Sequence, residues 1–313
     1  MLLSKLQEFE ALMPLNNEFM PDEYYRDIFH YTSPDGFRSI LLGSPKSVTI
    51  WASRHDCLND ASEGTIAEQV FLETCADLKD QGEIDEELYQ LFVTVRPAKT
   101  TLIDFREGDS MRLTRLECYR YICSFSKNPD SLAMWNYYSK GNKYEGFNIG
   151  FFLSGLTDSL DSFVGSIKAE YHIYPVVYKK EEQKALVRSL LLKLKELYSD
   201  DQKTSIRYII STYLKDWGLI FKSEFFQNEE EVRIIVDLPK KCSPLPVKYR
   251  TASGYIVPYI ELTLEKDSVS YCQFGPLQCE GCQKENQLSV LNEMLESNGY
   301  SACTGYSKIP VRY

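Results

Sequence analysis

Apolar and polar residues alternate along many short segments of the chain, and each segment is bounded by turn-forming residues. Alternation at every second position is typical of β-strands that bury one face. The pattern predicts strands at DIFHYT (27–32), SVTIWAS (47–53), CYRYICSFS (118–126), EGFNIGFF (145–152), EYHIYPVVY (170–178), EEVRIIVDL (230–238), GYIVPYIEL (254–262) and SVSYCQFG (268–275), with a last strand around 300–304.

Between these segments, apolar residues recur at steps of three and four, which is typical of helices. Such helices are predicted at 34–42, opened by Pro34, at about 65–80 and 84–94, at 130–140 with Asp130 or Ser131 as the cap, and at 284–297. A further helix is expected within residues 1–20, and two long helices within about 180–217.

Strands therefore occur at the beginning, middle and end of the chain, with helices between them. This order predicts an α+β fold with a mixed or antiparallel central sheet and flanking helices. We interpret residues 1–313 as one domain with a helical insertion at about 180–217. The glycine-rich motifs of common phosphate-binding loops, G-x-G-x-x-G and G-x-x-x-x-G-K-[ST], are absent from the sequence.

The composition restricts the classes of partner. The formal charge is 35 − 45 = −10, and an acidic protein is poorly suited to tight, non-specific binding of nucleic acid, although one nucleotide can still bind in a local pocket. No stretch reaches the ~18 apolar residues of a membrane span. The N-terminal segment carries acidic residues and lacks a signal-peptide cleavage site, so we expect a cytoplasmic protein without membrane contact.

Nine cysteines are scattered through the chain, and their odd number is unlike a secreted disulfide framework. Cys279 and Cys282 form a C-x-x-C pair, with Cys272 before it and Cys303 after it. A structural zinc site needs four converging ligands, and no histidine lies in this region. We therefore predict no metal site, with zinc at these four cysteines as the open alternative.

Four polar stretches stand where a strand or helix needs only apolar residues. They comprise His30, Tyr31 and Thr32; Arg54 with Asn59, Asp60 and Glu63; Ser124 and Ser126 with Trp135 and Tyr138; and Glu229 and Glu231 with Arg233. Each has an ordinary explanation: a buried histidine with a backbone partner, a turn, edge-strand residues, or a solvated strand face with an ion pair.

Glu229 and Glu231 suggest specific chemistry, because residues two apart on a strand point to the same face. Adjacent carboxylates repel each other unless a cation or hydrogen bonds compensate. They are useful where positive charge develops in a reaction. Cleavage of a nicotinamide–ribose bond is such a reaction, since its transition state resembles the oxocarbenium ion of glycoside hydrolysis.

The order of these motifs resembles a bacterial family, the domain-of-unknown-function 2971 family. The resemblance is carried by FHYTS…FRSIL, IWAS…LNDASEG, CSFS…AMWNYYS…EGFNIGF, NEEEVRII and YSKIPVRY, and it runs from about residue 27 to the C-terminus. That family is in turn distantly similar to the ADP-ribosyltransferase superfamily, which implies an ADP-ribosyltransferase-like fold and NAD as a substrate.

The resemblance implies roles for the polar residues. The superfamily has three strand motifs. The first, which binds NAD, is matched by His30, Tyr31 and Thr32. The second is matched by Ser124-Phe125-Ser126, and the third by Glu229-Glu230-Glu231. In these implied roles, His30 and Thr32 bind the ribose and the amide, and Ser124 and Ser126 brace the ribose and the catalytic acid. Trp135 or Tyr138 packs on a ring of the substrate. Arg54 or Arg233 binds a phosphate or orients the glutamates. Glu231 is the implied catalytic acid, Glu229 positions the acceptor, and the superfamily's habits suggest a toxin or an effector of phage defence.

Three function classes follow. The first is an NAD-dependent ADP-ribosyltransferase or NAD glycohydrolase, with His30, Ser124 and Glu231 lining one cleft; the acceptor remains open among protein, nucleic acid and water. The second is a nucleotide- or protein-binding module without turnover. The third is a hydrolase in which Asp60, Glu63, Glu229 and Glu231 hold a metal.

Overall fold

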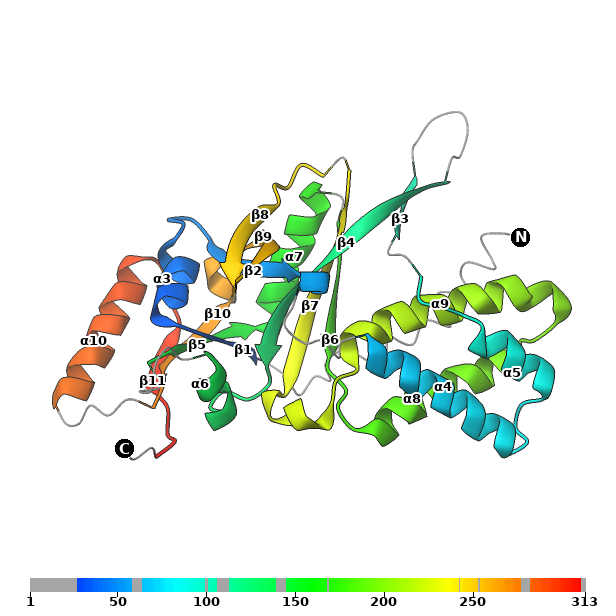
Figure 1. Cartoon of the computed structure of the whole chain (residues 1–313). Coiled ribbons are helices and arrows are strands. Elements are labelled where there is room, and N and C mark those ends of the chain that lie inside the picture. The colour runs from blue at the N-terminus through cyan, green and yellow to red at the C-terminus, as the bar shows by residue number, and fades with distance from the viewer. Residues whose placement is uncertain are drawn as a thin grey trace.

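The computed structural model describes residues 27–57, 64–98, 101–105, 113–138, 145–167, 169–241, 243–252, 254–276 and 282–310 (Figure 1). The strands are β1 (Asp27–Thr32), β2 (Val48–Arg54), β3 (Thr101–Phe105), β4 (Leu113–Ser126), β5 (Phe147–Phe152), β6 (Glu170–Pro175), β7 (Glu231–Pro239), β8 (Lys248–Ala252), β9 (Tyr255–Leu264), β10 (Val269–Phe274) and β11 (Cys303–Tyr306).

These strands form one open sheet. The main path runs β11-β10-β5-β1-β4-β2-β9-β8, while β7 pairs with β4 and β6, and β3 pairs with β4. The β10–β11 pair is parallel and the other pairs are antiparallel. The predicted α+β class with a mixed, mostly antiparallel sheet is confirmed.

Helices lie on both sides of the sheet (Figure 1). The α-helices are α3 (Pro34–Leu42), α4 (Thr65–Asp80), α5 (Glu86–Val93), α6 (Leu132–Tyr138), α7 (Leu153–Ile167), α8 (Lys180–Glu196), α9 (Lys203–Ile220) and α10 (Cys282–Ser297). Short 3₁₀ segments are η1 (His55–Cys57), η2 (Asp200–Gln202), η3 (Glu224–Glu229) and η4 (Lys266–Ser268).

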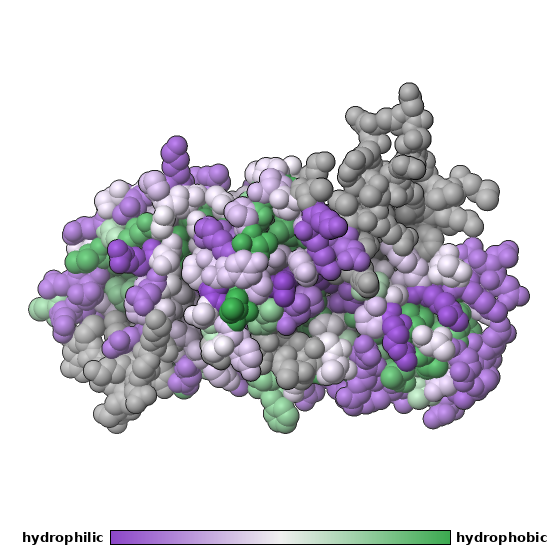
Figure 2. Space-filling model, turned by 45° about the horizontal axis from the view of Figure 1, so that its top comes forward, coloured by the Kyte–Doolittle hydropathy of each residue, from purple (hydrophilic) through white to green (hydrophobic). Residues whose placement is uncertain are grey.

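The alternation of strand side chains divides the interior into two cores. On one face of the sheet, which we call the first face, Ile50, Phe125 and Val232 pack with residues of α3, α7 and α10. On the opposite, second face, Ile122 and Ile235 pack with residues of α4, α5, α8 and α9. Figure 1 shows these last four helices gathered at one side of the sheet. Hydrophobic and hydrophilic residues are interspersed on the face drawn in Figure 2.

Most predicted elements occur near their predicted positions, and the two helices expected within 180–217 are α8 and α9. They pack with α4 and α5 from a distant part of the sequence. Among the α-helices and strands of the described residues, β3, α7 and β8 were not predicted. The sequence of α7, LSGLTDSLDSFVGSI, is rich in poor helix formers, and β8 is mostly exposed and lacks apolar alternation.

The helix expected within residues 1–20 lies outside the described residues. In the described part of the chain, no helix combines the length and the hydrophobicity required to cross a membrane.

Candidate functional site

The candidate site lies where β7 begins. The 3₁₀ segment η3 ends at Glu229, and Glu230 then adopts a left-handed conformation with a φ of 44° before the strand starts at Glu231. This conformation is unusual for a residue other than glycine. The turn is held by hydrogen bonds from the Lys127 amide to the Glu230 carbonyl (2.9 Å) and from Asn128 Nδ2 to Glu230 Oε1 (2.8 Å). It directs the carboxylates of Glu229 and Glu231 to the same lysine.

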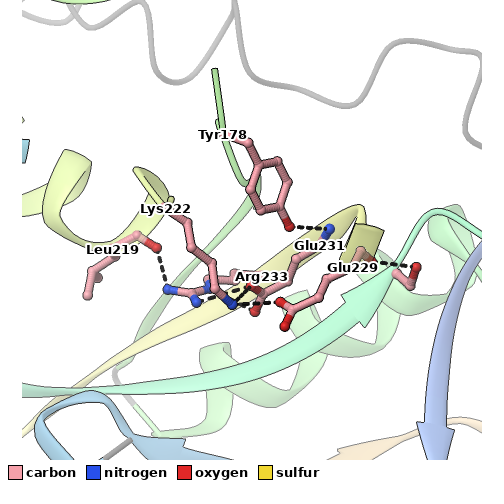
Figure 3. Close-up of polar contacts among 7 residues, drawn as sticks. Tyr178, Leu219, Lys222, Glu229, Glu231 and Arg233 are labelled. Atoms are coloured by element: carbon pink, nitrogen blue, oxygen red, sulfur yellow. Dashed lines mark hydrogen bonds and ion pairs between the residues drawn. The ribbon is translucent and has the colours of Figure 1, made fainter. Parts of the chain in front are cut away.

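Glu231 is 5% exposed, and polar groups surround its carboxylate (Figure 3). Arg233, two residues along the strand and therefore on the same face, donates from Nε to Oε1 (2.8 Å) and from Nη2 to Oε2 (3.1 Å). Lys222 Nζ lies 3.1 Å from Oε2, and the Ser124 hydroxyl is also hydrogen-bonded to this carboxylate. A buried carboxylate is stable only with such partners.

Lys222 connects the two glutamates. Its Nζ lies 2.6 Å from Glu229 Oε2, closer than to Glu231, and its side chain is buried. Backbone pairing places the lysine here, because the Lys222 amide donates to the Val177 carbonyl (3.1 Å) just after α9. Arg233 also holds this end of α9, since its Nη1 donates to the Leu219 carbonyl (2.7 Å).

The environment shifts the pKa values of the two glutamates in opposite directions. Burial acts to raise the pKa of Glu231, but the charges of Arg233 and Lys222 and the hydrogen bonds from Arg233 and Ser124 lower it to about 2. For Glu229, burial and the negative charge of Glu231 outweigh Lys222, and its pKa is raised. Burial acts to lower the pKa of Lys222, but the two carboxylates raise it, so the lysine stays cationic.

Two tyrosines border this cluster. The Tyr178 hydroxyl accepts a hydrogen bond from the Glu231 amide (2.9 Å). Tyr138, on α6, is 42% exposed, and burial of its hydroxyl end together with the charges of Glu231 and Glu229 raises its pKa. An exposed aromatic ring therefore stands beside a group of two carboxylates and two cations, of which Glu229 is half-buried and the other three are buried.

Five of the residues singled out in the sequence meet here. They are Ser124, Tyr138, Glu229, Glu231 and Arg233. The sequence pattern did not indicate Lys222 or Tyr178. Tyr178 ends a predicted strand and Lys222 follows a predicted helix, but only tertiary pairing brings these two segments together.

Ser126, Tyr31 and Trp135 lie close by but are used in packing. Ser126 is fully buried, and its hydroxyl donates to the Glu229 carbonyl (2.7 Å), so it positions the turn before β7. The Tyr31 hydroxyl donates to the Asn128 carbonyl (2.7 Å). Trp135 is 1% exposed, packs edge-on against Tyr31, and donates from its indole to Asp130 (2.8 Å). The indole ring is thus enclosed by protein.

His30 does not join the cluster. In the strand register Phe29 is paired with Ser126, which is paired in turn with Glu231, so these three share the second face of the sheet. His30 alternates with Phe29 and contacts Phe125 of the first face, with ring centroids 5.5 Å apart. This placement corrects the expectation that His30, Ser124 and Glu231 line one cleft.

His30 has a structural contact where it lies. Its Nδ1 is 3.0 Å from the Ser124 carbonyl, which requires a proton on that nitrogen, and burial lowers the pKa of the ring. Thr32 is two residues after His30 on β1, so its side chain also lies on the first face of the sheet. Arg54 is paired with Tyr121 of the first core and therefore also lies on the first face, where it pairs with Asp56 (2.6 Å) and stacks on the Tyr119 ring.

The metal hypotheses rest partly on residues outside the described ranges. Asn59, Asp60, Glu63 and Cys279 are among these. Across the described residues, no set of three or more His, Cys, Asp or Glu side chains is arranged to hold a metal ion. Cys272 is buried in the first core, whereas Cys282 and Cys303 are exposed.

The fold and this cluster define an α+β protein with two neighbouring glutamates, Glu231 buried and Glu229 half-buried, at the start of a central strand. Residues 134–234 match the family model described as "Protein of unknown function (DUF2971)". The match supports the resemblance to that family, and it includes Tyr138, Tyr178, Lys222 and both glutamates. No curated protein and no solved structure matches the chain.

Proposed function

We propose that Glu229 and Glu231 catalyse cleavage of the nicotinamide–ribose bond of NAD, with transfer of ADP-ribose to an acceptor or to water. The observation that carries this proposal is the pair of adjacent carboxylates whose pKa values are shifted in opposite directions. Environments that separate the pKa values of two neighbouring acids are characteristic of acid–base catalysis. The proposal includes the distant similarity to ADP-ribosyltransferases, a bacterial origin and a cytoplasmic location.

The two glutamates have separate roles in this chemistry. The bond between ribose C1′ and the nicotinamide nitrogen breaks, its electron pair leaves with neutral nicotinamide, and positive charge develops on the ribose. Glu231, ionised at neutral pH, stabilises that charge. Glu229, with its raised pKa, accepts the proton that the acceptor loses as it bonds to C1′.

Lys222 controls access to Glu231. Its contact with Glu229 is 2.6 Å and its contact with Glu231 is 3.1 Å, so the contact with Glu231 is the longer one. A ribose hydroxyl that replaces this longer contact leaves Glu231 held by Arg233 and leaves Lys222 paired with Glu229. The exposed ring of Tyr138 supplies a surface on which a planar base packs. His30, Thr32 and Arg54 have no part in this proposal.

The experiment is nicotinamide release from NAD by the purified full chain in the presence of EDTA. We expect release by the unmodified protein and a loss of at least about 100-fold in Glu231→Gln, because one electrostatic stabiliser of a transition state typically contributes this much. Glu229→Gln is expected to lower the rate of ADP-ribose transfer. It should also remove the pH dependence of this rate that the titration of Glu229 causes.

The matched control is Glu285→Gln, which neutralises an exposed glutamate on α10 far from the cluster. Thermal unfolding of each variant separates loss of activity from loss of structure. Equal release by Glu231→Gln and the unmodified protein contradicts the proposal, as does release that disappears with EDTA.

A second candidate is a module that binds a nucleotide or a protein without turnover. It is favoured by one observation, namely that Glu231 is 5% exposed and already paired with Arg233 and Lys222. In that case NAD raises the unfolding temperature and no nicotinamide is released. Ligand binding at 100 times Kd stabilises the folded state by about 2.7 kcal/mol, which a thermal shift detects.

A further inference from the structure

The strand β8 ends the strand order of the sheet. It pairs with β9 along one side, and its other side pairs with no strand of the described chain. An edge strand presents unpaired backbone N–H and C=O groups, and an extended peptide can add to them as a further strand. The chemistry of the side chains around β8 indicates which peptide fits.

The charge of this region opposes that of the whole protein. Residues 238–260 contain four basic residues and no aspartate or glutamate, whereas the whole chain has a formal charge of −10. Two of the cations, Lys248 and Arg250, lie on β8 itself. Lys248 pairs with Glu261 (2.7 Å), while Arg250 donates to the Ser53 hydroxyl (3.0 Å) and its Nε is buried without a hydrogen-bond partner.

Large apolar and aromatic residues are exposed in the same hairpin. Tyr249 is 68% exposed, Tyr255 is 71% exposed and Ile256 is 69% exposed. Cations alone on an edge strand are a common protection against aggregation. Exposed side chains of this size do not protect an edge, and grouped exposure of this kind marks interaction sites.

The register places Lys248 and Arg250 on one face of the hairpin and Tyr249 with Ile256 on the other. The exposed Tyr255 is paired with Ala252 and lies on the face of the cations. Lys248 and Arg250 are two residues apart and therefore share one face. Tyr249 lies between them and points to the other face, which it shares with Ile256 because Thr251 is paired with Ile256. A strand added beside β8 thus meets Lys248 and Arg250 on one face and Tyr249 on the other, where Ile256 of β9 extends the apolar surface.

We propose that the free edge of β8 binds an extended polypeptide segment of a partner protein in which acidic and apolar residues alternate. The acidic side chains lie on the face of Lys248 and Arg250, and the apolar side chains lie on the face of Tyr249 and Ile256. Pairing between two copies of β8 is disfavoured, because it brings the cations of both copies together.

The probe is a fluorescein-labelled peptide of alternating glutamate and valine, and its binding to the full chain is followed by fluorescence anisotropy. The control peptide has the same composition with the glutamates and valines in two blocks. We expect the alternating peptide to bind at least about fivefold more tightly, because only its side chains match both faces. The same peptide methylated on its backbone nitrogens is expected to lose binding, since it cannot donate to the strand edge.

Two variants test the faces separately. Lys248→Glu with Arg250→Glu is expected to weaken binding at least about fivefold, whereas the same reversal at exposed Arg38 and Lys46 leaves it unchanged. Ile256→Ser is expected to weaken binding, and Val290→Ser, which changes an exposed apolar residue of α10, is its control. Thermal unfolding confirms that each variant is folded.

Equal binding of the alternating and block peptides overturns the proposal, as does unchanged binding by the charge-reversal variant. Binding of single-stranded oligothymidylate without binding of the alternating peptide also overturns it, because the basic and aromatic residues then serve nucleic acid.

Discussion

Replacement of Arg233 by methionine tests how strongly the buried cluster stabilises the fold. Arg233 is 3% exposed and donates hydrogen bonds to both carboxylate oxygens of Glu231 and to the Leu219 carbonyl. Breaking a buried ion pair from one side typically costs 3–5 kcal/mol, because an uncompensated charge remains. Lys222 and Ser124 still contact Glu231, so we expect a loss near the lower end, about 3 kcal/mol.

Replacement of both Arg233 and Glu231 is expected to lower the free energy of unfolding much less than replacement of Arg233 alone. In the double variant Arg233→Met with Glu231→Leu, no unpaired charge remains at this position, because Lys222 still pairs with Glu229 at 2.6 Å. Apolar replacement of a whole buried ion pair is often close to neutral. The losses of unfolding free energy in the two single variants, added together, should therefore exceed the loss in the double variant by about 2 kcal/mol or more.

The assay is urea unfolding followed by both circular dichroism and tryptophan fluorescence, since coincident curves test whether one free energy describes the transition. The control is Arg188→Met, which removes a pair with Glu83 that is about one third exposed, and it should lower the free energy of unfolding by less than about 1 kcal/mol. A loss below about 1 kcal/mol for Arg233→Met, or strict additivity in the double variant, refutes the reasoning.

Three further outcomes are expected. Because the pKa of Glu231 is lowered from 4.5 to about 2, its contribution to stability is complete above pH 4.5 and is lost as the pH falls toward 2. Acid unfolding of Glu231→Gln should lack this component of about 3 kcal/mol. Tyr178→Phe should lower the free energy of unfolding by about 1 kcal/mol in urea, since the Glu231 amide loses its acceptor. Asp130→Ala should cost about 2 kcal/mol or more by the same assay and increase proteolysis of the C-terminal segment, because Asp130 accepts hydrogen bonds from Trp135, Ser307 and the Lys308 amide.

Local sequence patterns predicted much of the fold. Apolar and polar residues alternate so clearly in the segment 118–126 that this two-residue period alone predicts the strand and places Ser124 and Ser126 on one face. The shared face of Glu231 and Arg233 at the start of a strand was predictable in the same way. The expectation that Glu229 lies on the same strand was wrong, because Glu229 ends η3 and the left-handed turn at Glu230 brings its carboxylate to Lys222. By contrast, α7 contains two glycines and several serines, and its helix depends on burial of Leu156 and Leu160 against the sheet.

The remainder of the candidate site depends on information that local patterns do not contain. The strand register decides that Phe29, not His30, is paired with Ser126, and a shift of one residue reverses the face of every side chain. Lys222 reaches the glutamates because Val177 and Phe221 form a bridge between segments that are far apart in the sequence. Neither fact follows from the spacing of residues along one element.

The most direct test of the central claim is an NMR titration of the glutamate side-chain carboxyl groups of the ¹³C-labelled protein. Glu229→Gln and Glu231→Gln, each of which removes one signal, assign the two resonances. We predict that Glu231 stays ionised until the pH approaches about 2, and that Glu229 titrates above its ordinary range near 4.5. Titration of both groups at the ordinary value would contradict the account, because the two carboxylates would then have no separate roles.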